Sequence, residues 1–194
     1  MSADLSQCSD QDLAILARAH REDAYREFLR RYKAGVYRLI VRQIGDADEA
    51  MDLTQEAFVA GFSALDRYDG DRPFRTWIAH IALNKCHDWA RRRKVRAFFS
   101  RALPLESAHH IASDGPAPDS VATDRRELAR VRGAIDQLPQ SLREVLLLRG
   151  VDEVSQADTA VILRVSEKTV ETRLYRARTK LRELLAGTTA RVGG

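Results

Sequence analysis

Apolar residues recur every three or four positions along most of this chain, which is the spacing of one face of an α-helix. The clearest stretch covers residues 24–45 and ends at a glycine of the kind that terminates helices. Similar patterns cover about residues 12–20, 48–65 and 74–94, and Asp10 is placed to cap the first of them. No alternation of apolar and polar residues is long enough to indicate a β-strand. We therefore predict a compact N-terminal domain made of helices.

Helical periodicity is lost before Arg125, in a stretch dominated by alanine, serine, proline and aspartate. Such a composition is typical of a linker, because it offers little apolar surface to a core. Helical spacing then returns and continues nearly to the end of the chain. The predicted fold class is all-α, with two small helical domains at residues 5–95 and 125–187 and a flexible linker over residues 96–124.

Charge is distributed unevenly along the 194 residues, although the net charge is only +4. Residues 46–56 hold five acids and no base, whereas residues 72–101 hold nine bases and a single acid. Residues 167–182 hold six bases and two acids. One basic segment in each domain is typical of a protein that binds a polyanion. Basic runs also occur as solvated helix faces, so charge alone leaves that alternative open.

Several classes of protein are excluded or disfavoured by the residues present. The two cysteines, Cys8 and Cys86, suit a reducing compartment and provide no disulfide framework. No apolar run approaches the roughly 18 residues of a membrane span, so we expect a cytoplasmic protein without membrane insertion. The sequence has no glycine-rich phosphate loop, no paired catalytic carboxylates and no nucleophile with a base partner. We therefore expect a protein that is not an enzyme and needs no cofactor. We also expect no metal site, since His80 and Cys86 do not share a helix face.

The C-terminal domain contains a helix-turn-helix pattern. Ser155 and Asp158 have the spacing of a capping box, the first helix ends at Leu163, and Ser166 begins the second helix after a short turn. Apolar positions of the second helix are expected to face the core: Val170, Leu174, Ala177 and Leu181. Its polar face would present Lys168, Thr169, Thr172, Arg173 and Arg176. This face suits phosphates and guanine edges, although a solvated helical hairpin has the same pattern.

Two segments of the chain resemble a known family. The stretch from Leu138 to Leu184, with the helix-turn-helix, is similar to region 4 of bacterial RNA polymerase sigma factors, which reads the minus-thirty-five element. The stretch from Glu49 to Lys94, which includes DLTQEAF, is similar to their region 2. Because these two regions are joined only by a short acidic linker, the chain resembles the extracytoplasmic-function (ECF) group.

The resemblance implies roles for particular residues. The acidic segment would bind the β′ clamp helices of core RNA polymerase through Asp52, Leu53, Gln55, Glu56 and Phe58. The loop from Asp66 to Pro73 and the helix after it would hold the minus-ten element through Asp69, Arg72, Arg75, His80, Asn84, Arg91, Arg92 and Arg93. We expect His80, Asn84 and Arg91 to line one polar helix face away from Trp77 and Ile81. The aromatic residues Phe74, Trp77 and Trp89 are expected to be core residues.

The resemblance extends to the minus-thirty-five element, the β flap and a regulatory partner. The minus-thirty-five site would comprise Ser166, Lys168, Thr169, Thr172, Arg173 and Arg176. The implied partners are core RNA polymerase, through the β′ clamp helices and the β flap, promoter DNA and an anti-sigma factor. The acidic linker would lie in a basic channel of the polymerase. Four residues depart from the frequent family pattern: Gln156, Thr159, Arg164 and Glu171. Arg164 stands in a turn where the family frequently has glycine. Glu171 stands on the recognition helix where the family frequently has a basic residue, so the promoter sequence cannot be transferred from relatives.

The predicted function is therefore that of an alternative sigma factor that directs promoter-specific initiation after release from an anti-sigma factor. Two alternatives remain open at this point. A stand-alone helix-turn-helix regulator would bind duplex DNA without polymerase, but it leaves the acidic helix unexplained. A sigma mimic would sequester an anti-sigma factor without binding DNA, but its basic recognition face would then have no role.

Overall fold

The computed structural model describes residues 5–102 and 119–192, with side chains described over 5–98 and 125–187. Within these ranges the chain is helical and has no strand, as the all-α prediction requires. The N-terminal elements are α1 (Asp10–Arg18), α2 (Glu22–Ile44), α3 (Ala47–Ser63), the 3-10 turn η1 (Leu65–Arg67) and α4 (Phe74–Ala102). The C-terminal elements are α5 (Asp119–Asp136), α6 (Gln140–Gly150), α7 (Gln156–Leu163) and α8 (Glu167–Val192).

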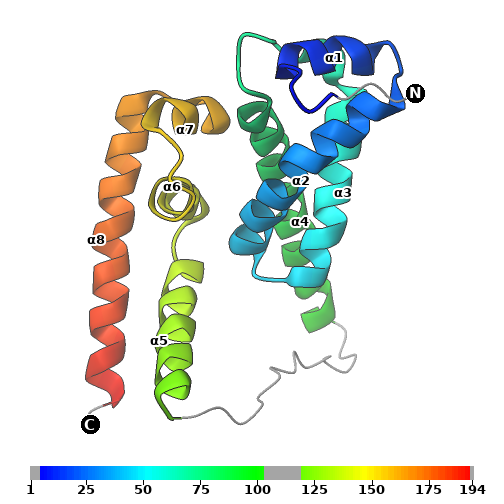
Figure 1. Cartoon of the computed structure of the whole chain (residues 1–194). Helices are drawn as coiled ribbons and strands as arrows, with labels where there is room; N and C mark the ends of the chain where they lie inside the picture. Colours follow the sequence, from blue (N-terminus) through cyan, green and yellow to red (C-terminus); the bar gives the residue numbers. More distant parts are fainter. Residues whose placement is uncertain (1–4, 103–118, 193–194) are drawn as a thin grey trace.

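In the N-terminal domain, α2, α3 and α4 pack against one another, and α1 lies across one end of α2 (Figure 1). Aromatic rings fill the core near that end. Phe28 of α2 stacks on Phe74 of α4 with ring centroids 4.0 Å apart, and both side chains are fully buried. Trp89 is also buried, whereas Trp77 is only partly buried. The core prediction is therefore confirmed for Phe74 and Trp89, and Trp77 lies at the edge of the core.

The first helix is capped by Ser9, and the prediction of Asp10 at that position is wrong. The Ser9 hydroxyl accepts a hydrogen bond from the Asp12 amide at 3.1 Å, as an N-cap does. The Asp10 carboxylate instead accepts from the Tyr32 hydroxyl at 2.7 Å and from the Phe74 amide at 3.1 Å. Asp10 therefore caps α4 across the fold, which its position in the sequence does not reveal.

Two glycines explain how α2, α3 and α4 connect and pack. Gly45 ends α2 with φ of 78°, a left-handed conformation that favours glycine. Gly61 of α3 lies against α4, where an added Cβ would be 2.8 Å from the Ile78 Cδ1 atom. These two positions let α3 fold back along α2 and approach α4 closely.

The C-terminal domain has a smaller core. Val145 of α6, Ala160 of α7 and Val170 of α8 meet where α7 and α8 cross. The small Ala160 side chain at this crossing fits the predicted helix-turn-helix. A second group, which includes Leu146 and Ala177, joins α6 to α8 farther along.

Helices extend beyond the domain limits predicted from the sequence. α4 continues to Ala102 and α5 begins at Asp119, so both enter the predicted linker of residues 96–124. Residues 103–118, which belong to this predicted linker, lie outside the described residues.

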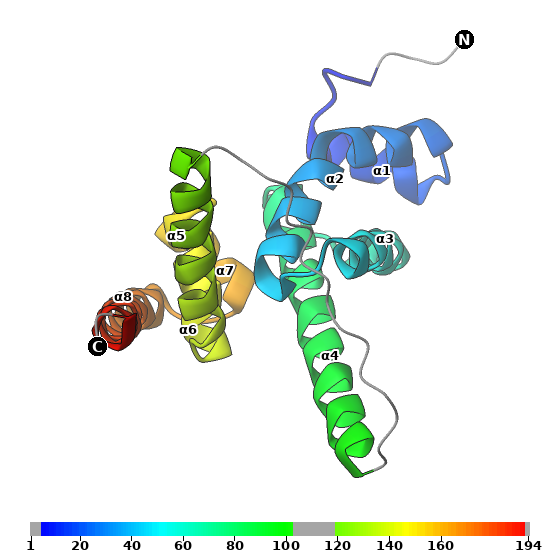
Figure 2. The same ribbon diagram turned by 90° about the horizontal axis from the view of Figure 1, so that it is seen from below.

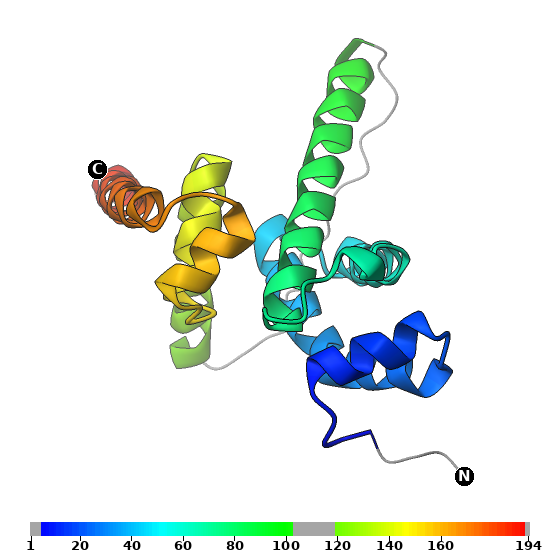
Figure 3. The same cartoon turned by 90° about the horizontal axis from the view of Figure 1, so that it is seen from above.

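The two domains are packed against each other. α6 and α7 lie between α8 and the N-terminal helices (Figures 2 and 3), with α6 contacting α2 and α7 contacting α4. Leu148 and Ile162 belong to the same buried cluster as the N-terminal core. At the rim, Arg42 of α2 pairs with Asp152, and the His87 Nε2 atom of α4 lies 2.5 Å from a Glu144 carboxylate oxygen.

Candidate nucleic-acid interface

The helix-turn-helix is built by two capped helices and one left-handed residue. The Ser155 hydroxyl accepts from the Asp158 amide at 3.0 Å, and the Ser166 hydroxyl accepts from the Thr169 amide at 3.2 Å. Between them, Arg164 ends α7 with φ of 52° and ψ of 48°. This conformation costs a residue other than glycine about 1 kcal/mol. Arg164 therefore adopts the left-handed conformation that a glycine would adopt at lower cost.

The first turns of α8 present the predicted polar face. Val170 and Ala177 are fully buried and Leu174 and Leu181 partly buried, which confirms the predicted core side of the helix. On the other side, the exposed members of the predicted minus-thirty-five set are Ser166, Lys168, Thr172 and Arg176. Thr169 and Arg173 are partly buried. Glu171 pairs with Lys168 at 3.0 Å, so part of the positive charge on this face is already compensated.

The predicted polymerase-binding residues divide into a surface and its support. Asp52 and Gln55 are exposed on α3, and Glu56 is partly exposed and pairs with Lys85 at 3.3 Å. Leu53 and Phe58 are buried in the core, with 1% and 3% of their surfaces exposed. They hold α3 in place but are not available to a partner, because their side chains point into the domain.

A groove separates the acidic face of α3 from the basic part of α4. Its lining includes Glu49, Asp52 and Glu56 on one side and Arg91, Arg92 and Arg96 on the other. The indole of Trp89 closes its floor and donates to the Glu49 carboxylate at 2.9 Å. Arg93 lies outside this groove, with its guanidinium 5.0 Å from the centre of the Trp89 ring. The acidic and the basic surfaces predicted from the sequence are thus neighbours.

The loop before α4 is tightly held. The Tyr68 hydroxyl donates to the Arg72 carbonyl at 2.6 Å, and the Asp69 carboxylate accepts from the Asp71 amide at 3.1 Å. The Arg18 guanidinium reaches across from α1 and donates to the carbonyls of Leu65 and Tyr68, each at 2.9 Å. Burial raises the pKa of Tyr68 to about 12, so this hydroxyl stays protonated as a donor. A preformed loop suits the capture of a base.

This loop, α4 and the end of α7 line a pocket of about 430 Å³ that brings together four of the predicted minus-ten residues, Asp69, Arg72, His80 and Asn84. Trp77 and Ile81 line the same pocket. The expectation that His80 and Asn84 face away from these two residues is therefore wrong. Positions 77, 80, 81 and 84 follow the helical spacing of a single stripe. The pocket consequently combines an aromatic wall with polar edges, which is what an unstacked base requires.

The other predicted minus-ten residues lie elsewhere. Arg75 pairs with Asp158 of α7 at 2.9 Å, and Arg91 pairs with Asp88 at 2.5 Å about four turns farther along α4. The predicted set thus forms a pocket, a contact at the domain interface and a basic stretch. The other eight residues of the pocket were not predicted as site residues: Ala64, Arg67, Tyr68, Thr76, Trp77, Ile81, Val161 and Arg164. Tyr68 could have been predicted, because it is an aromatic residue within the predicted loop. Val161 and Arg164 could not, because they come from the other domain and no local pattern indicates that contact.

His80 links the two domains. Its Nδ1 atom donates to the Ile162 carbonyl at 2.7 Å, and its Nε2 atom accepts from the Asn84 amide at 3.1 Å. Both bonds are made by a neutral imidazole with its proton on Nδ1. Burial lowers the pKa of His80 below its ordinary value of 6.5, and the charges of Arg164 and His87 act in the same direction, against the opposing effect of the Ile162 bond.

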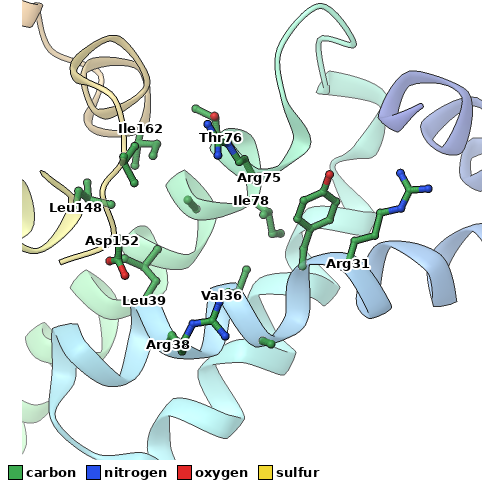
Figure 4. A pocket seen from close by; sticks show the side chains of 15 residues that line it. Arg31, Val36, Arg38, Leu39, Arg75, Thr76, Ile78, Leu148, Asp152 and Ile162 are labelled. Carbon is green, nitrogen blue, oxygen red and sulfur yellow. The ribbon is translucent and has the colours of Figure 1, made fainter. Parts of the chain in front are cut away.

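A cavity of about 340 Å³ lies between the domains (Figure 4). Val36 and Leu39 of α2 line one side, and Leu148, Asp152 and Ile162 line the other (Figure 4). This cavity is open to solvent, and Arg31, Arg38 and Arg75 also contribute to its lining.

Two families match the two domains. Residues 28–96 match the family described as Sigma-70 region 2, and residues 128–181 match the family described as Sigma-70, region 4. RNA polymerase sigma factor CnrH of Cupriavidus metallidurans is 38% identical over 181 residues, which cover 91% of this chain and 94% of that protein. ECF RNA polymerase sigma factor SigW of Bacillus subtilis is 31% identical over 168 residues, which cover 84% and 90%.

The chain belongs to the ECF group of RNA polymerase sigma factors.

Solved structures agree with this assignment. The structure of CnrH in complex with the cytosolic domain of CnrY matches 92% of this sigma factor and 97% of that chain, with a TM-score of 0.67 and 31% identity. The sigma factor RpoE of Bartonella quintana, solved with the anti-sigma factor NepR, has a TM-score of 0.63 at 22% identity, covers 84% of this chain and 96% of that chain, and shows the fold alone.

As a sigma factor, the protein binds core RNA polymerase and directs it to promoter DNA. Sigma factors are regulatory proteins by family and leave catalysis to the polymerase. None of the described helices of this sigma factor combines the length and apolarity needed to cross a bilayer. In the described residues, no three side chains of histidine, cysteine, aspartate or glutamate are grouped as a metal would need. The thiol of Cys86 is buried, and burial raises its pKa to about 12, which makes it unreactive.

Proposed function

We propose that this sigma factor divides promoter recognition between its two domains. The exposed α8 residues Lys168, Thr172 and Arg176 contact the minus-thirty-five element in the major groove, supported by Arg173. The pocket of Asp69, Arg72, His80 and Asn84 takes an unstacked base of the minus-ten element. The arginines at positions 91–93 hold the backbone of the strand that follows.

The observation that carries the proposal is this pocket. It joins a tightly bonded loop to a helix face that offers an aromatic wall, hydrogen-bonding edges and nearby positive charge. A stand-alone duplex-binding regulator has no need of a base-sized pocket. The family assignment supplies the context in which such a pocket serves promoter opening.

The acidic face of α3 is proposed to dock on the β′ clamp helices through Asp52, Gln55 and Glu56. Carboxylates of this kind steer association with a basic surface. The C-terminal domain is proposed to contact the β flap. We further propose that the protein works in the cytoplasm and catalyses no reaction itself, in agreement with its family.

An anti-sigma factor is proposed as the regulatory partner. CnrH was solved with the cytosolic domain of CnrY, and CnrH shares 38% identity with this chain over nearly its whole length. A partner that binds both domains at once would prevent them from reaching their two promoter elements.

Run-off transcription tests the proposal. Core RNA polymerase is given a genomic fragment library with and without the protein, and start sites that depend on the protein reveal its promoter motif. Tight duplex binding without any new start site would contradict the division of labour proposed here.

A binding measurement tests the docking face. Asp52→Arg reverses an exposed charge on α3, and we expect at least a tenfold loss of affinity for core polymerase, measured by fluorescence anisotropy of the labelled protein. Glu22→Arg, an exposed charge reversal at the start of α2, serves as the matched control and should bind normally. Equal affinities of the two variants would remove α3 from the polymerase interface.

A further inference from the structure

We propose that α1 positions the loop that captures the minus-ten base, with Arg18 as the positioning residue. This capture loop comprises residues 65–73, between α3 and α4. The inference rests on the proposed function of the pocket that the loop lines. It adds that α1, which supplies no residue to the lining of that pocket, determines how strictly the captured base is discriminated.

Arg18 holds the first part of the capture loop by its backbone. The Arg18 guanidinium donates to the Leu65 carbonyl and to the Tyr68 carbonyl, each at 2.9 Å. The side chains of Arg67, Tyr68 and Asp69, in the same stretch, line the pocket. Hydrogen bonds from a charged donor are stronger than those between neutral groups. The placement of these pocket side chains therefore depends on a residue that lies outside the pocket.

α1 also contacts the middle and the end of the capture loop. At Gly70, an added Cβ would lie 2.8 Å from the Gln11 Cγ atom, so a glycine at this position lets the loop approach α1 closely. Directly after the loop, the Phe74 amide donates to the Asp10 carboxylate at 3.1 Å. α1 thus supports the loop at its start, its middle and its end.

α1 is itself fixed to the N-terminal domain. Leu13 and Ala17 are fully buried, and Ala14 is 2% exposed. The Tyr25 hydroxyl of α2 donates to the Ala17 carbonyl at 2.6 Å, directly before Arg18. A functional loop is held most precisely by secondary structure that has its own packing. The contacts of α1 therefore fix the loop relative to the α4 face that forms the other wall of the pocket.

This support matters for discrimination because a base is selected by hydrogen-bonding groups in fixed positions. A loop without support can adjust to any base, and the protein then binds matched and mismatched bases with similar affinity. A loop that is ordered before DNA arrives also loses less conformational entropy on binding. Removal of the support is therefore expected to weaken binding of the matched base more than binding of the mismatched bases.

Base discrimination by the complex of the protein with core polymerase tests the role of Arg18. The probe is a fluorescein-labelled single-stranded oligonucleotide with the minus-ten sequence of a promoter mapped by run-off transcription, together with copies that carry each other base at each position. Anisotropy gives the ratio of affinities for the matched and the mismatched base. At the position that the original protein discriminates most strongly, we expect Arg18→Ala to lower this ratio about tenfold, and Arg18→Lys to retain part of it because an ammonium can still donate to a carbonyl.

Arg26→Ala is the matched control, since Arg26 is exposed on α2 and pairs with Glu22 rather than with the loop. This variant should keep the full ratio. All variants should bind core polymerase with the affinity of the original protein, because the docking face of α3 is unchanged. A merely structural role of Arg18 would lower the stability of the protein but would leave the ratio between bases as it is.

A second pair of variants displaces the loop without altering Arg18. Gly70→Ala pushes the loop away from Gln11 and should lower the ratio as Arg18→Ala does. Gln11→Ala removes the atoms at 2.8 and 3.2 Å and leaves the nearest approach at 3.3 Å, so the double variant should recover most of the ratio. This recovery tests the inference even where Arg18→Ala does not fold.

Two results would overturn the inference. A full ratio in Arg18→Ala would show that Arg18 does not position the loop. A loss in Gly70→Ala that the added Gln11→Ala does not reverse would show that contact with α1 is not its cause.

Asn84→Ala, which alters the pocket itself, separates these results from a failure of the proposed function. If Asn84→Ala loses discrimination while Arg18→Ala keeps it, the pocket captures a base and only the role of α1 is wrong. If the original protein discriminates at no position, or if Asn84→Ala keeps the full ratio, the pocket does not capture the base, and the proposed function and this inference both fail.

Discussion

A single carboxylate, Glu27, organises the start of the N-terminal domain. It is 8% exposed and accepts hydrogen bonds from Arg30 and Arg31, each at 2.7 Å. Arg31 in turn donates to the carbonyls of Leu5 and Cys8, which ties the segment before α1 to α2. The hydrogen bonds from the two arginines lower the pKa of Glu27 from 4.5 to about 2. The charged form is therefore part of the folded state.

We expect Glu27→Gln to lower the free energy of unfolding by about 1–3 kcal/mol at neutral pH, the usual worth of hydrogen bonds to charged groups. Because the folded pKa is depressed, this contribution is complete above pH 4.5 and is lost as the pH falls toward 2. Urea denaturation at pH 7 and pH 3 measures it. The difference in free energy of unfolding between the original protein and Glu27→Gln should be smaller at pH 3 than at pH 7. An equal difference at both pH values would rule out the Glu27 carboxylate as its source.

Arg173 tests the recognition face at the scale of one side chain. If it contacts a base edge, Arg173→Ala should weaken promoter binding by about 1–3 kcal/mol, and if it contacts a phosphate, the salt dependence of binding should flatten. Titration of promoter fragments at several salt concentrations distinguishes the two contacts. Arg182→Ala, farther along α8, is the control, and identical behaviour of the two variants would exclude Arg173 from the interface.

At the scale of elements, local signals predicted most of the C-terminal domain. The capping serines and the apolar spacing of α8 act over a few residues, so the sequence alone reveals them. The N-terminal capping of α4 by Asp10 acts over 64 positions and was assigned to the wrong helix. Likewise, Leu53 and Phe58 match a family motif, but only packing shows that they are buried.

The turn between α7 and α8 allows a prediction about the stability of the helix-turn-helix. Arg164 is held at φ of 52°, so Arg164→Gly should relieve the conformational strain and raise the free energy of unfolding by up to about 1 kcal/mol. The same replacement in the middle of α8, Arg178→Gly, should lower it by about 1 kcal/mol. Urea denaturation of both variants provides the comparison. A loss of stability in Arg164→Gly would show that its side-chain contacts outweigh the strain.

At the scale of the whole molecule, the sequence predicted two domains but not their packing. Arg42 and Asp152 are 110 positions apart, and Arg75 and Asp158 are 83 apart. Charge patterns show which segments are basic or acidic, but they do not show whether DNA, polymerase or the other domain supplies the opposite charge. This is why Arg75 was assigned to DNA alone and why Val161 was not recognised beside the pocket.

The His80 contact makes the domain packing sensitive to pH. Packing of the two domains favours the neutral form of His80, because burial lowers its pKa and Arg164 and His87 add positive charge nearby. Asp69 and Arg72 of the loop line the same pocket as His80. The contribution of His80 to this packing is therefore complete above about pH 6.5 and decreases as the pH falls below that value. Scattering at pH 7.5 and pH 5.5 should show expansion at the lower value. His80→Gln should reduce this response, and an unaltered response would assign it to another group.

The positions of the two tryptophans give the molecule a pair of built-in optical reporters. Trp77 forms a wall of the pocket at the loop, and Trp89 forms the floor of the groove between α3 and α4. Emission from Trp77 in a Trp89→Phe background would follow entry of a DNA strand or departure of α7. Emission from Trp89 in a Trp77→Phe background would follow docking of polymerase. The order in which the two surfaces become occupied during initiation is thus measurable by stopped-flow fluorescence, without attaching any dye to the protein.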